Sequence, residues 1–395
     1  MKRRSITVAC LLAAAVCLAA EAPTESPVAR ELAPYRRKLA SPDEAVRQKA
    51  YDAYLNAGSE GRELLREALL ALRKARLDAC RGISIAPASQ KKLLAIHEKV
   101  EEARKEARRV IFDKKIYPDA DHGRAGQPVV DKAVELAKQG VEKYHQPAFG
   151  WALARVPRSR LARGRARGKA LMVGFPSGSL LRRFRKLAAA HQHVLEIDTR
   201  LALCGAEGVE LRPSLQSLVG PGVEPELVEA LAEIAEFLDY VERCLLYNAR
   251  VATSMSEGER EVVDLTNEYR IQLGIRPLAI NQLLARAARK HSQEMARLGY
   301  FGHTSPKEEN RTPGKRCRNE GYGHYRGENC ASGASASGAF RMWYHSSGHH
   351  RNMLNPKSTE IGVGHAGPWT EDFGADPDLD LDHPPRKWDS PNAEK

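Results

Sequence analysis

Two histidines and one glutamate in the C-terminal third have the side chains of a metal or acid–base site. His303 and His349 each lie in a turn-like segment that contains glycine, and Glu328 follows a glycine at the end of an expected strand. Loops on a rigid scaffold commonly carry binding groups. Two neutral imidazoles can hold Zn²⁺ while a carboxylate orients a bound water or a ring. Because two histidines form a weak cage, we expect such a metal ion to be loosely held and exchangeable.

Histidines are concentrated in the same region. Of the 13 histidines in the chain, seven lie between His291 and His365, and imidazole is the commonest transition-metal ligand. His350 is adjacent to His349 and is a candidate for a further ligand. We interpret the remaining four as surface or hydrogen-bonded groups; they are His291, His324, His345 and His365.

Four short phrases surround these residues in a fixed order. They are FGHTSP at Phe301–Pro306, GENCASG at Gly327–Gly333, WYHSSGHHRNML at Trp343–Leu354 and EIGVGHAGPWTEDFG at Glu360–Gly374. Over roughly residues 259–375 the chain resembles the CAP superfamily of cysteine-rich secretory, antigen 5 and pathogenesis-related class 1 proteins. The resemblance implies an α+β fold, a three-layer α-β-α sandwich around a small antiparallel sheet.

The same resemblance implies which residues line a cleft. The matching positions are His303, Glu328 and His349, with a second acidic residue expected three positions after the tryptophan. In this chain that fourth position is Ser346. The missing acid weakens any acid–base mechanism that requires two carboxylates.

Three classes of function are compatible with these features. We favour a secreted, non-enzymatic binding protein, because members of the family bind lipids or protein partners. The first alternative is a metal-dependent hydrolase, such as a peptidase, in which His303 and His349 hold zinc and Glu328 is the general base. The lack of a His-Glu-x-x-His or Gly-x-Ser-x-Gly motif argues against it. The second alternative is a structural protein of the cell envelope.

The N-terminus has the pattern of a signal peptide. Three basic residues at positions 2–4 precede an apolar run from Ile6 to Ala20, which is short for a membrane-spanning helix. We therefore expect residues 1–22 to be removed and the protein to be secreted or located in the periplasm or cell envelope. Lipid attachment at Cys17 is an alternative that the bulky Val16 disfavours.

Two of the cysteines that follow can form a disulfide. Cys317 and Cys330 lie thirteen residues apart in the CAP-like region, and an exported protein meets oxidising conditions. Sequence alone does not determine connectivity. The alternative is that the cysteines are small, buried apolar residues.

The net charge of +12 is unevenly distributed. Residues 251–395 carry 19 basic and 19 acidic residues, so the entire excess lies in residues 1–250. The segment Arg155–Lys186 contains eleven basic residues and no acidic one. In an exported protein we expect this segment to meet anionic envelope polymers, lipid headgroups or a partner, and not nucleic acid. A solvated basic loop is the alternative.

The first 250 residues are predicted to be all-α. Apolar residues recur every three or four positions from Leu93 to Val110 and from Leu227 to Leu245, a spacing typical of packed helices and one that permits self-association. Ser41 is expected to cap a helix that begins with Pro42. We therefore interpret residues 23–40 as a linker and 41–251 as a helical bundle, interrupted by a loop at 150–178.

The C-terminal third alternates between helices and strands. Helices are predicted at 259–273, 281–298 and 335–344, a strand at 322–331, and a hairpin from strands at 361–366 and 369–373. Helices on both sides of a small antiparallel sheet follow from this order. The CAP-like domain is predicted at 258–375. The tail at 376–395, rich in Asp and Pro, is predicted to be disordered.

Overall fold

The computed structural model describes residues 26–41, 43–80, 83, 85–119, 124–149, 151–157, 170–176, 179–205, 213–219 and 222–385. The expected signal peptide, and residues 158–169 of the basic segment, lie outside the described residues. Contacts divide the chain into two units, Met1–Gln90 with Arg182–Ala232, and Lys91–Leu181 with Glu233–Lys395. Much of the predicted helical bundle therefore falls in the same contact unit as the C-terminal domain.

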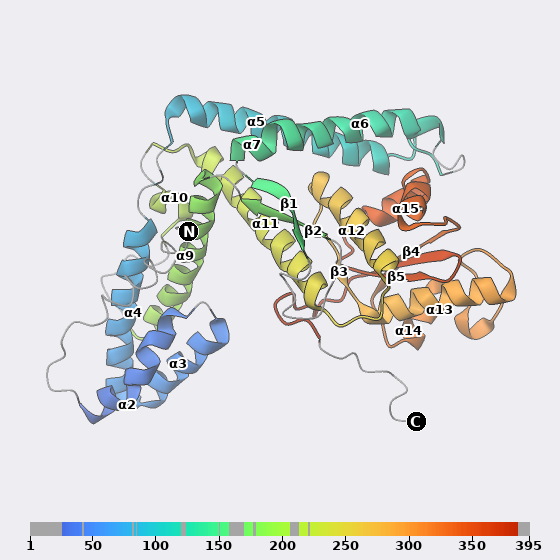
Figure 1. Ribbon diagram of the computed structural model, residues 1–395. Coiled ribbons are helices and arrows are strands. Elements are labelled where there is room, and N and C mark those ends of the chain that lie inside the picture. The colour runs from blue at the N-terminus through green and yellow to red at the C-terminus, as the bar shows by residue number, and fades with distance from the viewer. Residues whose placement is uncertain are drawn as a thin grey trace, which may run out of the picture. The chain divides into compact units, whose positions relative to one another are not determined.

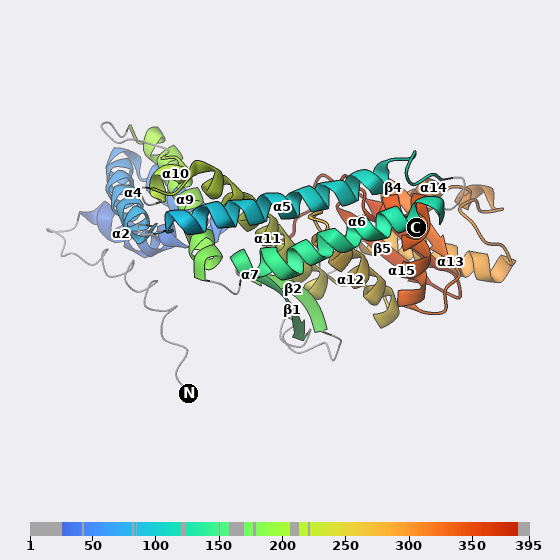
Figure 2. The same cartoon turned by 90° about the horizontal axis from the view of Figure 1, so that it is seen from above.

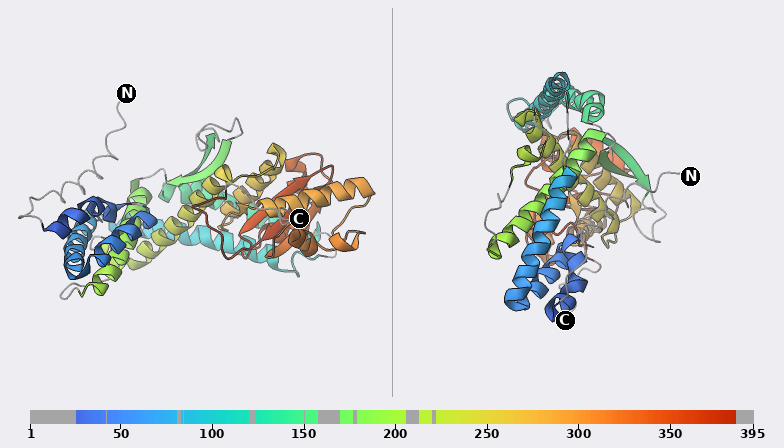
Figure 3. Two further views of the ribbon diagram at one scale, coloured as in Figure 1. Left: turned by 90° about the horizontal axis from the view of Figure 1, so that it is seen from below. Right: turned by 90° about the vertical axis from the view of Figure 1, so that its left-hand side faces the viewer.

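The first unit is a small set of packed helices, visible in Figure 3. It contains α2 (Pro27–Arg36), the 3-10 turn η1 (Arg37–Ala40), α3 (Glu44–Asn56), α4 (Gly58–Cys80), most of α9 (Ser179–Leu203), α10 (Leu215–Leu218) and the first residues of α5 (Pro87–Phe112) and α11 (Pro225–Arg250). Tyr51, Leu69 and Ile197 are buried in its core. An ion pair of 2.5 Å joins Arg47 on α3 to Glu196 on α9.

Two predictions about the start of this unit are wrong. Within the segment 23–40, expected to be a linker, residues 27–40 are helical because the Ser26 hydroxyl caps α2 and Leu32 is buried against the core. The next helix is capped by Asp43 and not by Ser41. The Asp43 carboxylate accepts hydrogen bonds from two backbone amides of the first turn, which satisfies groups that a helix start leaves unpaired.

The second unit contains the rest of the elements. They are the remainder of α5, η2 (Arg124–Gly126), α6 (Gln127–Gln139), the π-helical η3 (Gly140–His145), α7 (Gln146–Phe149), β1 (Trp151–Pro157), β2 (Ala170–Pro176), the remainder of α11, α12 (Glu257–Gln272), β3 (Ala279–Ile280), α13 (Gln282–Leu298), η4 (Glu308–Asn310), α14 (Pro313–Asn319), β4 (Tyr325–Ala331), α15 (Ala336–Tyr344), α16 (Ser347–Met353), β5 (Glu360–His365) and β6 (Trp369–Gly374). The predicted loop at 150–178 instead contains an antiparallel hairpin of β1 and β2. Each strand is mainly apolar, a composition that suits a strand better than a loop.

The C-terminal sheet has four strands in the order β3-β5-β6-β4. The pairs β5–β6 and β4–β6 are antiparallel, whereas β3 and β5 run parallel. The chain between β3 and β5 passes through helices α13 to α16, and such a crossover permits parallel pairing. The predicted α+β class is confirmed, but the sheet is mixed and not wholly antiparallel.

Helices cover both faces of this sheet, as Figure 1 shows. On one face α13 lies so close to β5 that a Cβ on Gly362 would be 2.1 Å from the backbone nitrogen of Ala285. On the other face α12 and α15 bury Val263 and Trp343 against the sheet. Asn281 and Ser335 cap α13 and α15, as predicted. The three-layer arrangement is the one that the motifs imply.

A further layer, formed by α5 and α6, packs on this domain. The two helices lie side by side in Figure 2, and Val110 and Val134 share a buried cluster with Tyr269 of α12. The Arg104 guanidinium donates to the backbone carbonyl of Gln272 at 3.1 Å. The apolar seam of α5 was visible in the sequence, but periodicity does not identify the surface that a seam packs against.

The start of the predicted disordered tail is packed. Leu381 is buried in the core of the C-terminal domain, and Asp382 pairs with Arg243 of α11 at 2.7 Å. Residues 386–395 lie outside the described residues. In the part of the chain that the structure describes, no helix combines the length and apolarity needed to cross a membrane.

Candidate functional site

The three residues of the expected cleft lie on separate elements that meet at one edge of the sheet. Glu328 is on the edge strand β4, and His303 is in the loop that follows α13. The sequence predicted that His349 lies in a turn at the end of a helix, and this prediction is wrong. The helical break lies earlier, at Ser346, and His349 occupies the first turn of α16.

The Glu328 carboxylate is held by two neighbours. His303 Nδ1 donates to Oε1 at 2.8 Å, and Arg316 Nη2 donates to Oε2 at 2.5 Å. The Glu328 side chain is 1% exposed, whereas that of His303 is 47% exposed. Since Nδ1 is bound to the carboxylate, a metal ion or ligand would meet the His303 ring at Nε2. Glu328 therefore orients an exposed imidazole.

A second carboxyl group lies directly opposite Glu328 in the sheet, because Asp372 is its partner on β6. Burial disfavours charge on Glu328, but the hydrogen bond from His303 and the charge of Arg316 outweigh it and hold its pKa below the usual value. Burial and the negative charge of Glu328 raise the pKa of Asp372 well above its usual value. Two like charges at this separation disfavour each other, so the pair favours charge on Glu328 and a neutral Asp372.

His349 lies beside His303. The two ring centroids are 5.9 Å apart and the ring planes are inclined by 50°. Ser346, the fourth cleft position, is half-buried at the N-cap of α16, and its side chain forms no capping hydrogen bond. His350 does not serve as a third ligand here: it is fully buried, with Nε2 2.8 Å from the Tyr269 hydroxyl.

Cys317 and Cys330 do not form the disulfide that the sequence permitted. Both thiols are free. Cys317 packs in an apolar cluster with Leu284 and Ala287, while Cys330 Sγ lies 3.6 Å from Glu328 Oε1. Burial raises the pKa of both thiols. The two cysteines therefore belong to separate surroundings and remain protonated.

A buried group of potential ligands also contains Glu328. Atoms of His291, Glu328 and Cys330 lie within 4.8 Å of one another. His291 Nε2 is engaged at 2.9 Å by the carbonyl of Gly302, the thiol is protonated, and the Arg316 cation occupies the carboxylate. A hydrogen-bonded network explains this group better than a metal centre, since metal ligands must be deprotonated.

The opposite face of the same strands carries another buried acid. Glu371 accepts hydrogen bonds from Thr266 at 3.0 Å and from Asn329 at 3.1 Å. Burial raises the pKa of Glu371 to about 8, although the hydrogen bonds oppose this shift. The side chain is therefore predominantly protonated at neutral pH.

This shift gives a pH-dependent prediction for Glu371→Gln. An acid whose pKa is raised from about 4.3 in the unfolded chain to about 8 in the fold stabilises the fold at low pH, and that stability is lost as pH rises through this window. We expect the wild type to lose a few kcal/mol of unfolding free energy between pH 5 and 8, and the variant to lose less. Urea denaturation at several pH values measures this, with exposed Glu309→Gln as the control. Equal pH slopes in the wild type and Glu371→Gln would contradict the prediction.

Sequence reasoning missed two residues of this site, Arg316 and Asp372. Arg316 lies on the short helix α14, in a basic stretch where no spacing marks one arginine as buried. Asp372 follows Glu371 in the predicted hairpin strand. Since successive side chains of a strand point to opposite faces, one of these two acids must face inward. That alternation was the one signal in the sequence that could have indicated a buried carboxyl.

Residues 263–373 match the family model described as "Cysteine-rich secretory protein family", CAP. The C-terminal third is therefore a CAP-type domain, as its motifs predict. Two proteins from Bacillus subtilis (strain 168) are similar to part of this chain. The uncharacterized protein YkwD is 37% identical over 126 residues, which cover 31% of this chain and 48% of YkwD. The uncharacterized membrane protein YlbC is 34% identical over 110 residues, which cover 27% of this chain and 31% of YlbC.

The aligned region thus spans less than half the length of either relative. Among solved structures, an extracellular protein containing an SCP domain from Bacillus anthracis str. Ames is 33% identical, with a TM-score of 0.29, over 30% of this chain and 40% of that one. An outer surface protein from Borrelia burgdorferi is 20% identical, with a TM-score of 0.28, over 30% of this chain and 93% of that one.

Proposed function

We propose that this chain is an exported, non-enzymatic binding protein whose His303–His349 pair binds a divalent transition-metal ion such as Zn²⁺. The observation that carries the proposal is the clamped position of Glu328, between His303 Nδ1 and Arg316. This arrangement fixes the His303 ring with Nε2 as its ligand atom. Export is supported by the signal-like N-terminal sequence.

The two imidazoles fit a zinc ion. Two rings that bind one tetrahedral ion through Zn–N bonds of about 2.0–2.1 Å have centroids roughly 5 Å apart. The observed separation of His303 and His349 is 5.9 Å, so a small side-chain adjustment brings both to one ion. With two protein ligands and the remaining positions open to water or a partner's side chain, the site suits reversible binding.

The hydrolase alternative requires Glu328 to act as a general base. An efficient base at neutral pH has a pKa near 7, whereas the surroundings of Glu328 lower its pKa. Both of its oxygens are also engaged, and its side chain is 1% exposed. These features favour a positioning role over proton transfer from water.

Zinc titration of the full chain by calorimetry tests the proposal. We expect the wild type to bind with micromolar affinity and the double variant His303→Ala/His349→Ala to lose one equivalent of zinc. Glu328→Gln is expected to weaken this site by about 10–100-fold, because outer-shell partners tune the ligands that they orient. Half-exposed His324 provides the matched control, His324→Ala, which should leave the titration unchanged.

Two results would contradict the proposal. An unchanged zinc stoichiometry in the double variant would remove the histidine pair as the binding site. Peptide hydrolysis that disappears in Glu328→Gln, while zinc binding persists, would instead support the hydrolase. Thermal unfolding in EDTA checks that each variant is folded.

A further inference from the structure

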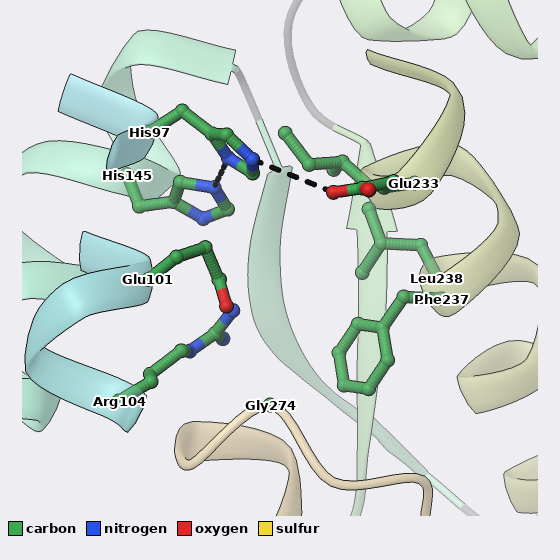
Figure 4. Close-up of a pocket in the computed structure, with 9 residues that line it drawn as sticks. His97, Glu101, Arg104, His145, Glu233, Phe237, Leu238 and Gly274 are labelled. Atoms are coloured by element: carbon green, nitrogen blue, oxygen red, sulfur yellow. Dashed lines mark hydrogen bonds and ion pairs between the residues drawn. The ribbon is translucent and has the colours of Figure 1, made fainter. Parts of the chain in front are cut away.

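A second pair of histidines faces a cavity outside the CAP-type motifs. The cavity has a volume of about 120 Å³ and lies among α5, η3, α11 and the end of α12. Its wall includes His97, Glu101, His145 and Glu233 (Figure 4). All four belong to the second unit of the chain.

We propose that this cavity is a second metal site, in which His97 Nδ1, His145 Nε2 and the Glu101 carboxylate bind a divalent transition-metal ion, with zinc the best match. The ligand atoms of the three residues lie within 4.8 Å of one another. Mixed imidazole and carboxylate ligands suit zinc. The site is independent of the His303–His349 pair and does not rest on the function proposed for it.

The distance between the two imidazoles matches zinc geometry. His97 Nδ1 and His145 Nε2 are 3.4 Å apart. Two nitrogens bound to one tetrahedral zinc, each at about 2.0–2.1 Å, are separated by roughly 3.3 Å. The ring centroids are 5.7 Å apart, so the two nitrogens point almost straight at each other, and each ring must tilt to direct its lone pair at a shared ion. Glu101 lies one helical turn after His97 on α5, so both project from the same helix face.

The other nitrogen of His97 has a carboxylate partner. Its Nε2 lies 3.7 Å from Glu233 Oε2, on α11. A carboxylate beside the outer nitrogen of a ligand histidine favours a proton there and leaves the inner nitrogen to the metal. Glu233 is 67% exposed, whereas the His97 side chain is 12% exposed, so Glu233 lies on the solvent side of the site.

His145 reaches the cavity through an unusual backbone segment. It is the last residue of the π-helical η3, whose buried residues are Gly140, Val141 and His145. π-Helical turns are rare and occur frequently at functional sites. Here the turn packs on α5, because a Cβ at Gly140 would lie 3.4 Å from the Val100 side chain. His145 is 2% exposed, so its ring lines the enclosed side of the site.

One cation lies near the proposed ion. Arg104 Nη1 is 2.6 Å from Glu101 Oε1 and its Nε donates to a carbonyl of α12. A carboxylate has two oxygens, so Glu101 can keep Arg104 on one and bind the ion through the other. The charges of Glu101 and Glu233 offset the repulsion between Arg104 and a divalent ion. An ion here would join α5, η3 and α11.

The test uses the full chain carrying His303→Ala/His349→Ala, so that the exposed pair is removed. The substitutions added to it are His97→Gln, Glu101→Gln, His145→Gln and Glu233→Gln. The control is His383→Gln, whose side chain is 84% exposed. ZnCl₂ is titrated by calorimetry, and CoCl₂ is used as a spectroscopic probe for tetrahedral coordination. Unfolding in EDTA establishes that each variant folds without metal.

The parent is expected to bind one equivalent of zinc and to melt at a higher temperature with it. His97→Gln and His145→Gln should each weaken binding by about 100-fold or more, and Glu233→Gln by about 10–100-fold, while His383→Gln has no effect. If His145→Gln fails to fold, His97→Gln and Glu101→Gln carry the test. No zinc uptake by the folded parent, or uptake that these substitutions leave unchanged, would overturn the proposal.

Discussion

Arg316→Met is expected to destabilise the C-terminal unit by about 3–5 kcal/mol at pH 7, because it leaves the Glu328 carboxylate buried without its cation. Arg316 and Glu328 are 3% and 1% exposed, and their closest atoms are 2.5 Å apart. Arg316 also donates to the carbonyl of Asn310 at 2.8 Å, so methionine leaves that acceptor unpaired as well. Chemical denaturation followed by circular dichroism measures the loss.

The pH dependence of this loss has a definite sign. The pKa of Glu328 is lowered in the fold, so its ion pair stabilises the protein above the unfolded value of about 4.3 and this contribution is lost as pH falls. The difference between wild type and Arg316→Met should therefore shrink in acid. Adding Glu328→Gln to Arg316→Met removes the unpaired charge and should restore part of the stability. A double variant less stable than Arg316→Met would contradict the account.

Trp343→Ala is expected to cost about 3–5 kcal/mol, because it removes a large side chain from a packed core. Trp343 on α15 is 0% exposed and shares a cluster with Val263 of α12, Phe373 of β6 and Tyr247 of α11. Its loss should loosen the attachment of α11 as well as the layer above the sheet. The measurement is the free energy of unfolding from urea denaturation.

Trp343→Phe is the matched control. Among the described residues the indole Nε1 has no hydrogen-bond partner, so phenylalanine removes volume but no hydrogen bond. We expect it to cost clearly less than alanine. If both variants lost the same stability, packing volume would not be the reason for the effect.

The C-terminal domain was predictable because its signals are local. Asn281 and Ser335 are capping residues placed directly before apolar helical patterns, and Gly367 marks the turn between the two strands of the hairpin. Each of these residues determines the conformation of backbone only a few positions away. Local signals do not show that His303 and Glu328 lie close together. That prediction came from the resemblance of the four sequence phrases to the CAP superfamily.

The rest depended on contacts between distant segments. The apolar stripe of α5 indicated a helix but no partner, and its contact with α12 spans more than 150 residues, as between Arg104 and Gln272. His97 and His145 carried no motif, because their approach depends on how α5 packs against the π-helical turn. Likewise, Cys317 and Cys330 satisfied the sequence criteria for a disulfide, but both thiols are free, and the apolar cluster that holds Cys317 does not include Cys330.

The most direct test of the account is an anomalous difference map, recorded at the zinc absorption edge, from crystals of the full chain soaked in ZnCl₂. We predict a peak between the rings of His303 and His349, with Glu328 still paired with Arg316, because that carboxylate positions an imidazole. A zinc ion bound directly to Glu328, with Arg316 displaced, would contradict the central claim. That result would favour the metal-dependent hydrolase instead.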